Sequence, residues 1–186
     1  MNSKLIAISG PTAVGKTLFA VELAKNLDTE VISFDSRQFY KEMTIGTAVP
    51  SKEELKQVKH HFIQHKSIFD NYNINDYNRD VDSLIKILSK KKKYIVLVGG
   101  SNLYLKSIIY GLDNIPKTPN ELREKLNFEF KTKGIEYIQQ LLKKLDINYY
   151  KNVDLQNHRR IIRALEVSIF TKKPFSSFLK GTKKEK

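Results

Sequence analysis

An eight-residue segment near the N-terminus, GPTAVGKT at residues 10–17, has the spacing of a phosphate-binding loop. It follows an apolar run at 5–9 that predicts a buried strand, and a helical pattern runs on from Lys16 to about Leu27. Its glycines let backbone N–H groups converge on phosphate oxygens, and the helix N-terminus adds a favourable dipole. Lys16 would bring positive charge to the terminal phosphate, and the Thr17 hydroxyl could hold Mg²⁺. We therefore expect phosphate to bind at Gly10, Pro11, Thr12, Ala13, Val14, Gly15, Lys16 and Thr17.

A carboxylate follows the second predicted strand. The short apolar run 31–34 ends at Asp35, whereas the run 94–98 is followed by glycine, glycine and serine at 99–101. Kinases, ATPases and GTPases usually hold their metal with an acid at the end of a further buried strand. Here the third predicted strand ends without a carboxylate, and the acid instead follows the second strand. The carboxyl ends of parallel strands share the sheet edge where ligands bind, so Asp35 is a candidate general base or metal ligand. The structural alternative for Asp35 is a helix or turn cap.

The elements that must position these residues alternate between strands and helices. Apolar runs at 5–9, 31–34 and 94–98 predict strands, and helical patterns occupy 16–27 and about 75–90. Continuous apolar strands are typical of a parallel sheet that is covered on both faces. We expect an α/β fold of the P-loop NTPase type: a parallel sheet with helices on both faces, plus a small helical insertion lobe.

The pattern changes after Gly111. Residues 119–145 and 154–170 are helical and highly charged, with no strand pattern between them. The expected parts are therefore a P-loop α/β core over 1–112, a helical insertion over 113–153, a helix and following segment that return to the core over 154–179, and a mobile tail over 180–186.

The composition is strongly basic, because 33 lysines and arginines against 20 aspartates and glutamates give a formal net charge of +13. A polyanionic partner such as nucleic acid would explain this excess. Lysine supplies most of it, however, and a chain rich in Lys, Asn and Ile is also what an A·T-biased genome encodes. Charge alone leaves both explanations open.

Cysteine is absent from the sequence, which excludes a disulfide framework and a thiolate metal site and fits a reducing compartment. Residues 1–4 lead into an apolar run too short for a signal peptide. No apolar stretch approaches the roughly 20 residues that span a bilayer. We expect a cytoplasmic, soluble monomer without membrane contacts.

Further sequence blocks follow the phosphate loop in a fixed order: DSRQFYKEMTIGTA at 35–48, HHFI at 60–63, VGGSNLYLKSIIYGL at 98–112, RRIIRALEV at 159–167 and TKKPFSSF at 171–178. With these blocks the chain resembles the tRNA dimethylallyltransferases, also called tRNA isopentenyl transferases, over essentially its whole length. The phosphate loop alone is not specific to that family. Its combination with DSRQFY, IGTA and RALEV is highly specific.

The resemblance implies transfer of a dimethylallyl group from dimethylallyl diphosphate to N6 of adenine 37, beside the anticodon of tRNA. The loop would hold a diphosphate rather than ATP, which would account for the missing acid after the third strand. Lys16, Mg²⁺ on Thr17 and backbone N–H groups would stabilise the leaving diphosphate. Asp35 would be the catalytic base. Ser101, where the family usually has threonine, could donate to the bridging oxygen of the diphosphate; its alternative role is a small turn residue.

The same resemblance assigns tRNA contacts to Asp35, Ser36, Arg37, Gln38, Ser101, Arg123, Arg159, Arg160, Ile161, Ile162 and Arg163. Gln38 can present a donor and an acceptor to a base edge, and arginines suit phosphates or stacking. Taken without the resemblance, the cluster at 159–163 could equally be a solvated helix face. The adenine would leave its stack to reach the diphosphate, while the lobe at 113–153 would grip the anticodon stem.

Some positions depart from the family pattern. Val49 stands where the family usually has lysine, Gln64 replaces an acid, and His158 replaces a common proline. The chain is also shorter than the family's members, so activity is a weaker expectation than ancestry. The adjacent His60 and His61 would point to opposite faces of an extended segment, which favours structural roles over metal binding.

Three other functions stay open. A small-molecule P-loop kinase would share the loop, but it lacks the DSRQFY block and usually has an acid after the third strand. An enzyme that prenylates free AMP or ADP would not need the basic charge and the arginine cluster. A shortened RNA-binding remnant would bind the anticodon stem-loop without turnover.

Overall fold

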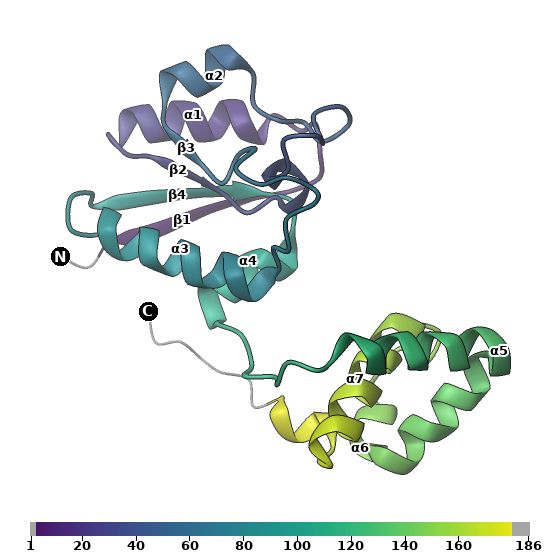
Figure 1. The fold of residues 1–186 in the computed structure, drawn as a ribbon. Coiled ribbons are helices and arrows are strands. Elements are labelled where there is room, and N and C mark those ends of the chain that lie inside the picture. Colours follow the sequence, from purple (N-terminus) through teal and green to yellow (C-terminus); the bar gives the residue numbers. More distant parts are fainter. Residues whose placement is uncertain (1–2, 180–186) are drawn as a thin grey trace. The chain divides into compact units, whose positions relative to one another are not determined.

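The computed structural model describes residues 3–179, which form two compact units (Figure 1). The α/β unit runs to Gly111, and the helical unit begins at Leu112. Each unit is described by itself. The tail expected at 180–186 lies outside the described residues.

The α/β unit is built on a parallel sheet of four strands in the order β1-β4-β2-β3. The strands are β1 Lys4–Ser9, β2 Val31–Ser33, β3 His60–His61 and β4 Tyr94–Gly99. Ser9 pairs with Gly99 and Ser33 pairs with Val98, so β1, β2 and β4 end at the same edge. This register brings the phosphate loop, Asp35 and the glycine pair after β4 to one edge, as predicted.

Helices cover both faces of this sheet (Figure 1). Its helical elements are α1 Lys16–Asn26, the 3₁₀ turn η1 Ser36–Phe39, α2 Lys52–Gln57, α3 Ile74–Leu88 and α4 Asn102–Tyr110. Val96 on β4 packs with Val21 of α1, whereas its neighbour Leu97 packs with Tyr77 of α3. Because successive strand side chains point to opposite faces, one apolar run fills both cores. The predicted P-loop NTPase-type α/β fold is confirmed.

β1 differs from the buried strand that its sequence predicts. Its residues are exposed or half-buried and none is fully buried, although the sequence LIAIS at 5–9 is almost wholly apolar. The reason is its place in the sheet, since β1 pairs with β4 alone among the described strands. A strand at a sheet edge lacks the neighbour that would complete its burial.

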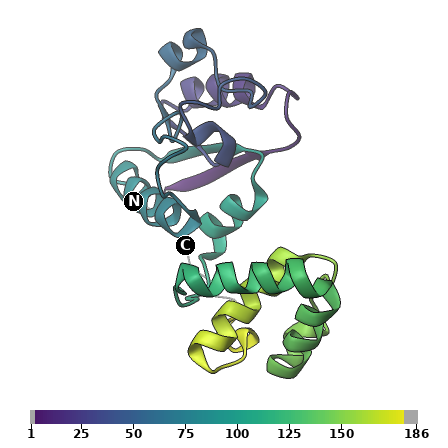
Figure 2. The same cartoon turned by 45° about the vertical axis from the view of Figure 1, so that its right-hand side comes forward.

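The helical unit contains α5 Asn120–Leu145, α6 Ile147–Tyr150, α7 His158–Thr171 and the 3₁₀ turn η2 Phe175–Phe178. Gly134 has φ 82° and interrupts α5 with a kink. α5 and α7 pack together around a core of their own, which includes Leu126, Ile138 and Leu165 (Figure 2). Residues 154–179 were expected to return to the α/β core. That expectation is wrong for α7, because its apolar face is buried against α5 within the helical unit.

Within residues 3–179, no helix combines the length and apolar character that crossing a membrane requires.

Candidate active site

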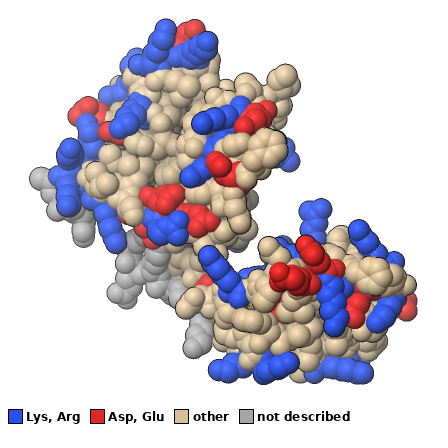
Figure 3. Space-filling view, in the orientation of Figure 1, with Lys and Arg blue, Asp and Glu red and all other residues tan. Residues whose placement is uncertain are grey.

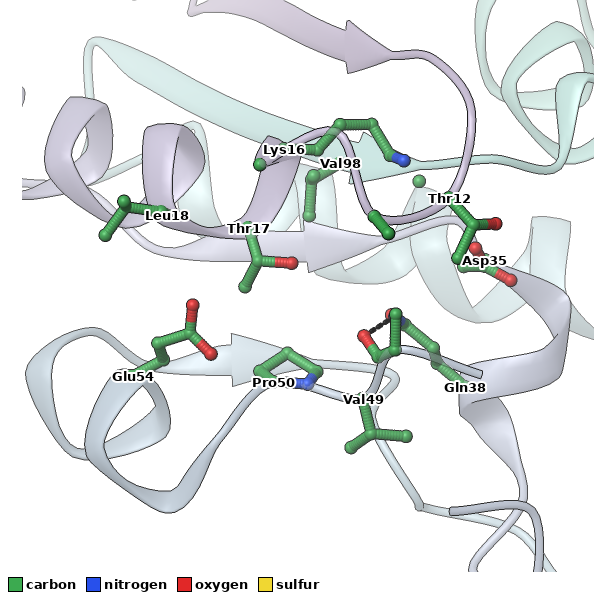
Figure 4. A pocket seen from close by; sticks show the side chains of 14 residues that line it. Thr12, Lys16, Thr17, Leu18, Asp35, Gln38, Val49, Pro50, Glu54 and Val98 are labelled. Carbon is green, nitrogen blue, oxygen red and sulfur yellow. Dashed lines mark hydrogen bonds between the residues drawn. The ribbon is translucent and has the colours of Figure 1, made fainter. Parts of the chain in front are cut away.

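A cavity of about 250 Å³ opens at the carboxyl edge of the sheet in the α/β unit (Figure 4). The phosphate loop and the start of α1 form one side of it. Asp35 and Gly99 line it from the ends of β2 and β4, and segment 48–50 with Glu54 closes the other side. The residues of the predicted loop that line it are Thr12, Ala13, Gly15, Lys16 and Thr17.

The phosphate loop owes its shape to two residues in the left-handed region, Ala13 with φ 64° and Gly15 with φ 88°. A Cβ at Gly15 would meet no atom within 4 Å, so its glycine is needed for conformation rather than for space. α1 starts directly after it, and none of the described side chains caps that N-terminus. Its first N–H groups therefore remain available as donors at the cavity, together with the positive end of the helix dipole.

The remaining loop residues support this arrangement. Lys16 folds across the loop, and its ammonium donates to the Pro11 carbonyl, which keeps the charge beside the loop. Thr17 lines the cavity one residue further along α1. Gly10 and Pro11 form the start of the loop, and Val14 is exposed. The three lie within the loop but are not among the described residues that line the cavity.

Asp35 caps a turn, which is the structural alternative given for it, and it also lies at the cavity. Its Oδ1 accepts a hydrogen bond from the Arg37 N–H at 3.2 Å and so caps η1, and the residue also lines the cavity. The two glycines after β4 make room for it. A Cβ at Gly99 would lie 2.7 Å from the Asp35 nitrogen, and a Cβ at Gly100 would lie 3.2 Å from Asp35 Oδ2. Close approach of β2 to β4 thus depends on these glycines.

Ser101 lies beside this carboxylate segment but is not among the described residues that line the cavity. Its hydroxyl accepts from the Ser36 N–H at 3.1 Å and lies 3.1 Å from the Ser36 hydroxyl. These bonds tie the start of α4 to η1. Ser36 is half-buried, and Arg37 is exposed at the surface.

Gln38 is placed differently from its expected role of reading a base edge. The residue is 7 % exposed, and both ends of its carboxamide bind the chain itself. Oε1 accepts from the Ser33 hydroxyl at 3.0 Å, and Nε2 donates to the carbonyls of Thr47 at 3.2 Å and Ala48 at 2.7 Å. Gln38 lines the cavity, but its donor and acceptor are both engaged within the chain, so the geometry does not support a base contact by its side chain.

The predicted arginines of the helical unit fall into two groups. Arg123 forms two hydrogen bonds to Glu166, with Nε to Oε2 at 2.8 Å and Nη2 to Oε1 at 2.7 Å, and Arg163 also donates to Oε1. Glu166 is fully buried. Burial acts to raise the pKa of Glu166, but the hydrogen bonds and charges of the two arginines bring that pKa below its usual value. The three side chains together join α5 to α7.

Of the neighbouring predicted tRNA contacts on α7, two side chains are buried and two are exposed. Ile161 and Ile162 are 0 % and 3 % exposed and pack in the core, so the geometry does not support tRNA contacts by their side chains. Arg159 and Arg160 are exposed. Figure 3 shows lysines and arginines spread over both units with acids among them, rather than one continuous basic patch on this face.

A family model described as IPP transferase matches residues 38–186. The chain belongs to the IPP transferase family. Curated relatives named tRNA dimethylallyltransferase include one from Christiangramia forsetii, 51 % identical over 186 residues, and one from Flavobacterium johnsoniae, 48 % identical over 181 residues. The matches cover 100 % and 94 % of this chain but only 62 % and 59 % of those relatives. The chain therefore spans about three-fifths of their length.

Solved structures agree with this assignment to the IPP transferase family. A full-length tRNA isopentenylpyrophosphate transferase from Bacillus halodurans is 36 % identical with a TM-score of 0.59, and the match covers 93 % of this chain and 57 % of that one. A eukaryotic dimethylallyltransferase described as acting on tRNA is 26 % identical with a TM-score of 0.80, covering 98 % of this chain and 46 % of that one.

Sequence patterns did not identify the residues that line the cavity opposite the phosphate loop. Glu54 lies there, and its carboxylate accepts from the Ser51 N–H at 2.7 Å in a capping box at the start of α2. The S-x-x-E spacing could have located this helix start, but no local pattern places it opposite Thr17. His60 and His61 have structural partners: the Val58 carbonyl at 2.8 Å and Glu30 at 2.5 Å.

Proposed function

We propose that this chain binds dimethylallyl diphosphate in the cavity of the α/β unit and supports transfer of its dimethylallyl group to N6 of adenine 37 in tRNA. One observation carries the proposal: the phosphate loop and the Asp35 carboxylate line the same cavity. A diphosphate held by the loop would place its allylic carbon within the space that Asp35 also faces. Relatives named tRNA dimethylallyltransferase support transfer of a dimethylallyl group to tRNA.

In the proposed reaction, a bond forms between N6 and the allylic carbon while the carbon–oxygen bond to the diphosphate breaks. The N–H groups at the start of α1 and the Lys16 ammonium stabilise the negative charge that grows on the leaving diphosphate. The proton released from N6 passes to the Asp35 carboxylate. The Ser101 hydroxyl, tied to Ser36, is proposed to position the Asp35 segment and to face the departing oxygen.

We propose Mg²⁺ as the cofactor, held by the Thr17 hydroxyl. A single hydroxyl from the protein suits this ion, because Mg²⁺ in such sites is bound by few protein groups and takes its other ligands from substrate phosphates and water. Thr17 lines the cavity directly after Lys16. When bound, the ion would supply positive charge to the diphosphate.

We further propose that the helical unit contacts the anticodon stem through exposed Arg159 and Arg160, with Arg37 contributing from the α/β unit. Arginine forks suit phosphate oxygens, and the chain's charge of +13 favours a polyanion. Action on tRNA places the protein in the cytoplasm in this proposal.

The decisive assay combines an anticodon stem-loop, dimethylallyl diphosphate and Mg²⁺, with N6 modification read by mass. Replacement Asp35→Ala is expected to abolish turnover while dimethylallyl diphosphate affinity stays within about threefold, because the carboxylate handles the proton and not the diphosphate. Near-normal turnover by Asp35→Ala would show that another group is the base.

Thermal stabilisation by ATP, with none by dimethylallyl diphosphate, would instead favour the small-molecule kinase. Binding of stem-loop and donor without any turnover would identify a binding remnant.

A further inference from the structure

The side of the cavity that faces the phosphate loop carries a short apolar stretch beside the Glu54 carboxylate. Ala48, Val49 and Pro50 line it, and Figure 4 shows Pro50 lying across from Thr17. Pro50 is buried, whereas Val49 is half-buried. One side of the cavity thus offers N–H donors and an ammonium, and residues 48–50 on the other side offer carbon atoms next to the Glu54 carboxylate. An allylic diphosphate has the same division, with an anionic end and a hydrocarbon end.

Residues 48–50, which we call the apolar wall, include a backbone conformation that is unfavourable without stabilising contacts. Ala48 has φ 48°, in the left-handed region that alanine rarely adopts. The segment lies between the exposed loop at 41–46 and α2, so neither strand pairing nor helix bonds hold it. Its backbone is instead held by the Gln38 carboxamide, which donates to the Ala48 carbonyl at 2.7 Å and to the Thr47 carbonyl at 3.2 Å.

Gln38 is in turn fixed from the sheet. The Ser33 hydroxyl at the end of β2 donates to Gln38 Oε1 at 3.0 Å and also accepts from the Asp35 N–H at 3.2 Å. The buried Tyr77 hydroxyl donates to the Ser33 carbonyl at 2.9 Å. Because Oε1 must face the Ser33 hydroxyl, Nε2 must face the wall, and the amide has one satisfied orientation. A single network therefore sets both the Asp35 backbone and the wall.

We propose that Gln38 is a positioning residue that holds residues 48–50 as an apolar wall against the hydrocarbon end of the allylic diphosphate. The inference rests on the proposed function and deepens it, since it gives the donor's two ends separate binding surfaces. Apolar contact along this wall contributes to affinity for the prenyl donor and contributes nothing to affinity for a diphosphate alone. Gln38 acts through the wall and not through contact with RNA.

The test compares three probes on the chain of 186 residues: dimethylallyl diphosphate, inorganic pyrophosphate and an anticodon stem-loop. Gln38→Met keeps the length of the side chain and removes its hydrogen bonds. It is expected to weaken dimethylallyl diphosphate about tenfold, the scale of one lost hydrogen-bonded contact, and to leave pyrophosphate and stem-loop affinity within about twofold. The ratio of the two diphosphate affinities separates this role from a general loss of structure.

Gln64 offers a matched control. Its carboxamide contacts the same loop further from the cavity, with Nε2 at 3.0 Å from the Thr44 hydroxyl and 3.4 Å from the Lys41 carbonyl. Gln64 has φ 46°, which asparagine tolerates, so Gln64→Asn shortens the side chain at little backbone cost. The affinity of Gln64→Asn for both diphosphates is expected to stay within about twofold of the unsubstituted chain.

A second variant keeps the proposal testable if Gln38→Met does not fold. Val49→Thr preserves shape and adds a hydroxyl to the wall, and should weaken dimethylallyl diphosphate about threefold without changing pyrophosphate affinity. Equal losses for the two diphosphates, or a loss confined to the stem-loop, overturn the positioning role and leave the proposed function standing. If the unsubstituted chain binds pyrophosphate and ATP but not dimethylallyl diphosphate, both the proposed function and the inference fail.

Discussion

The two units of this chain use their charged side chains in opposite ways. In the α/β unit, Lys16 and Asp35 line a cavity, and each contacts a backbone group of its own segment. In the helical unit, Arg123 and Arg163 bind the buried carboxylate of Glu166. Charges in the first unit face a space that a ligand could fill, and charges in the second unit join two helices. A charged residue type alone therefore does not tell whether its side chain faces a cavity or joins two helices.

The largest expected effect tests the structural use of charge. Glu166→Ala removes the charge-assisted hydrogen bonds of two partly exposed arginines and should lower the free energy of unfolding of the helical unit by about 3 kcal/mol. Pyrophosphate binding by the α/β unit should stay unchanged. Denaturant unfolding followed by circular dichroism measures the first, and calorimetry measures the second. Glu124→Ala, at an exposed position on α5, is the control; equal stability of the two variants would contradict the structural role.

The next effect tests the binding use of charge. Lys16→Ala removes the loop's ammonium and should weaken pyrophosphate about 100-fold, which corresponds to about 3 kcal/mol, with little change in unfolding. Lys25→Ala, on the same helix, should leave pyrophosphate affinity within about twofold. Isothermal titration at one salt concentration gives both values. Loss of affinity in both variants to the same extent would mean that the field of the whole protein, and not the loop, attracts the anion.

The units should also differ in their response to pH. Burial, together with the charge of Lys66, lowers the pKa of His65 to about 4. The unfolded chain therefore takes up a proton between about pH 6.5 and pH 4 that folded His65 does not, and the α/β unit should lose about 2 kcal/mol over this range. The lowered pKa of Glu166 makes the helical unit lose stability only as pH falls below about 4.5.

Unfolding curves at pH 7 and pH 5 measure this difference. His65→Phe keeps a ring among Phe39, Phe62 and Tyr72, and it should remove much of the loss between these values. His60, whose pKa burial also lowers, should account for the remainder. An unchanged pH dependence in His65→Phe would assign the effect to other groups.

The smallest effect concerns the exposed arginines of α7. Arg159→Ala with Arg160→Ala should weaken an anticodon stem-loop about fivefold and reduce the slope of log affinity against log salt by about 1 to 2. Lys131→Ala, at an exposed position on α5, should have a smaller effect. Filter binding at several salt concentrations measures both. If Arg159→Ala with Arg160→Ala weakens stem-loop binding no more than Lys131→Ala does, the two arginines are not a specific RNA contact of the helical unit.

Local patterns were sufficient for the phosphate loop, for the sheet and for the position of Asp35 at its edge. The physical reason is that each depends on short-range rules: glycine spacing shapes the loop, apolar runs become strands of a covered parallel sheet, and parallel strands end at one edge. Family resemblance added the reaction, which spacing does not give. Ser9 pairs with Gly99, so β1 and β4 do end at one edge.

Tertiary packing settled which polar residues remain available for ligands. Gln38 and Arg123 stand in segments typical of RNA contacts, yet their partners Ala48 and Glu166 lie 10 and 43 residues away. No local pattern reveals that such a partner will be brought close and that its burial will demand a hydrogen bond. The same is true of α7, whose apolar face could pack on either core and is buried against α5. Long-range packing, rather than residue type, assigned these side chains to structure.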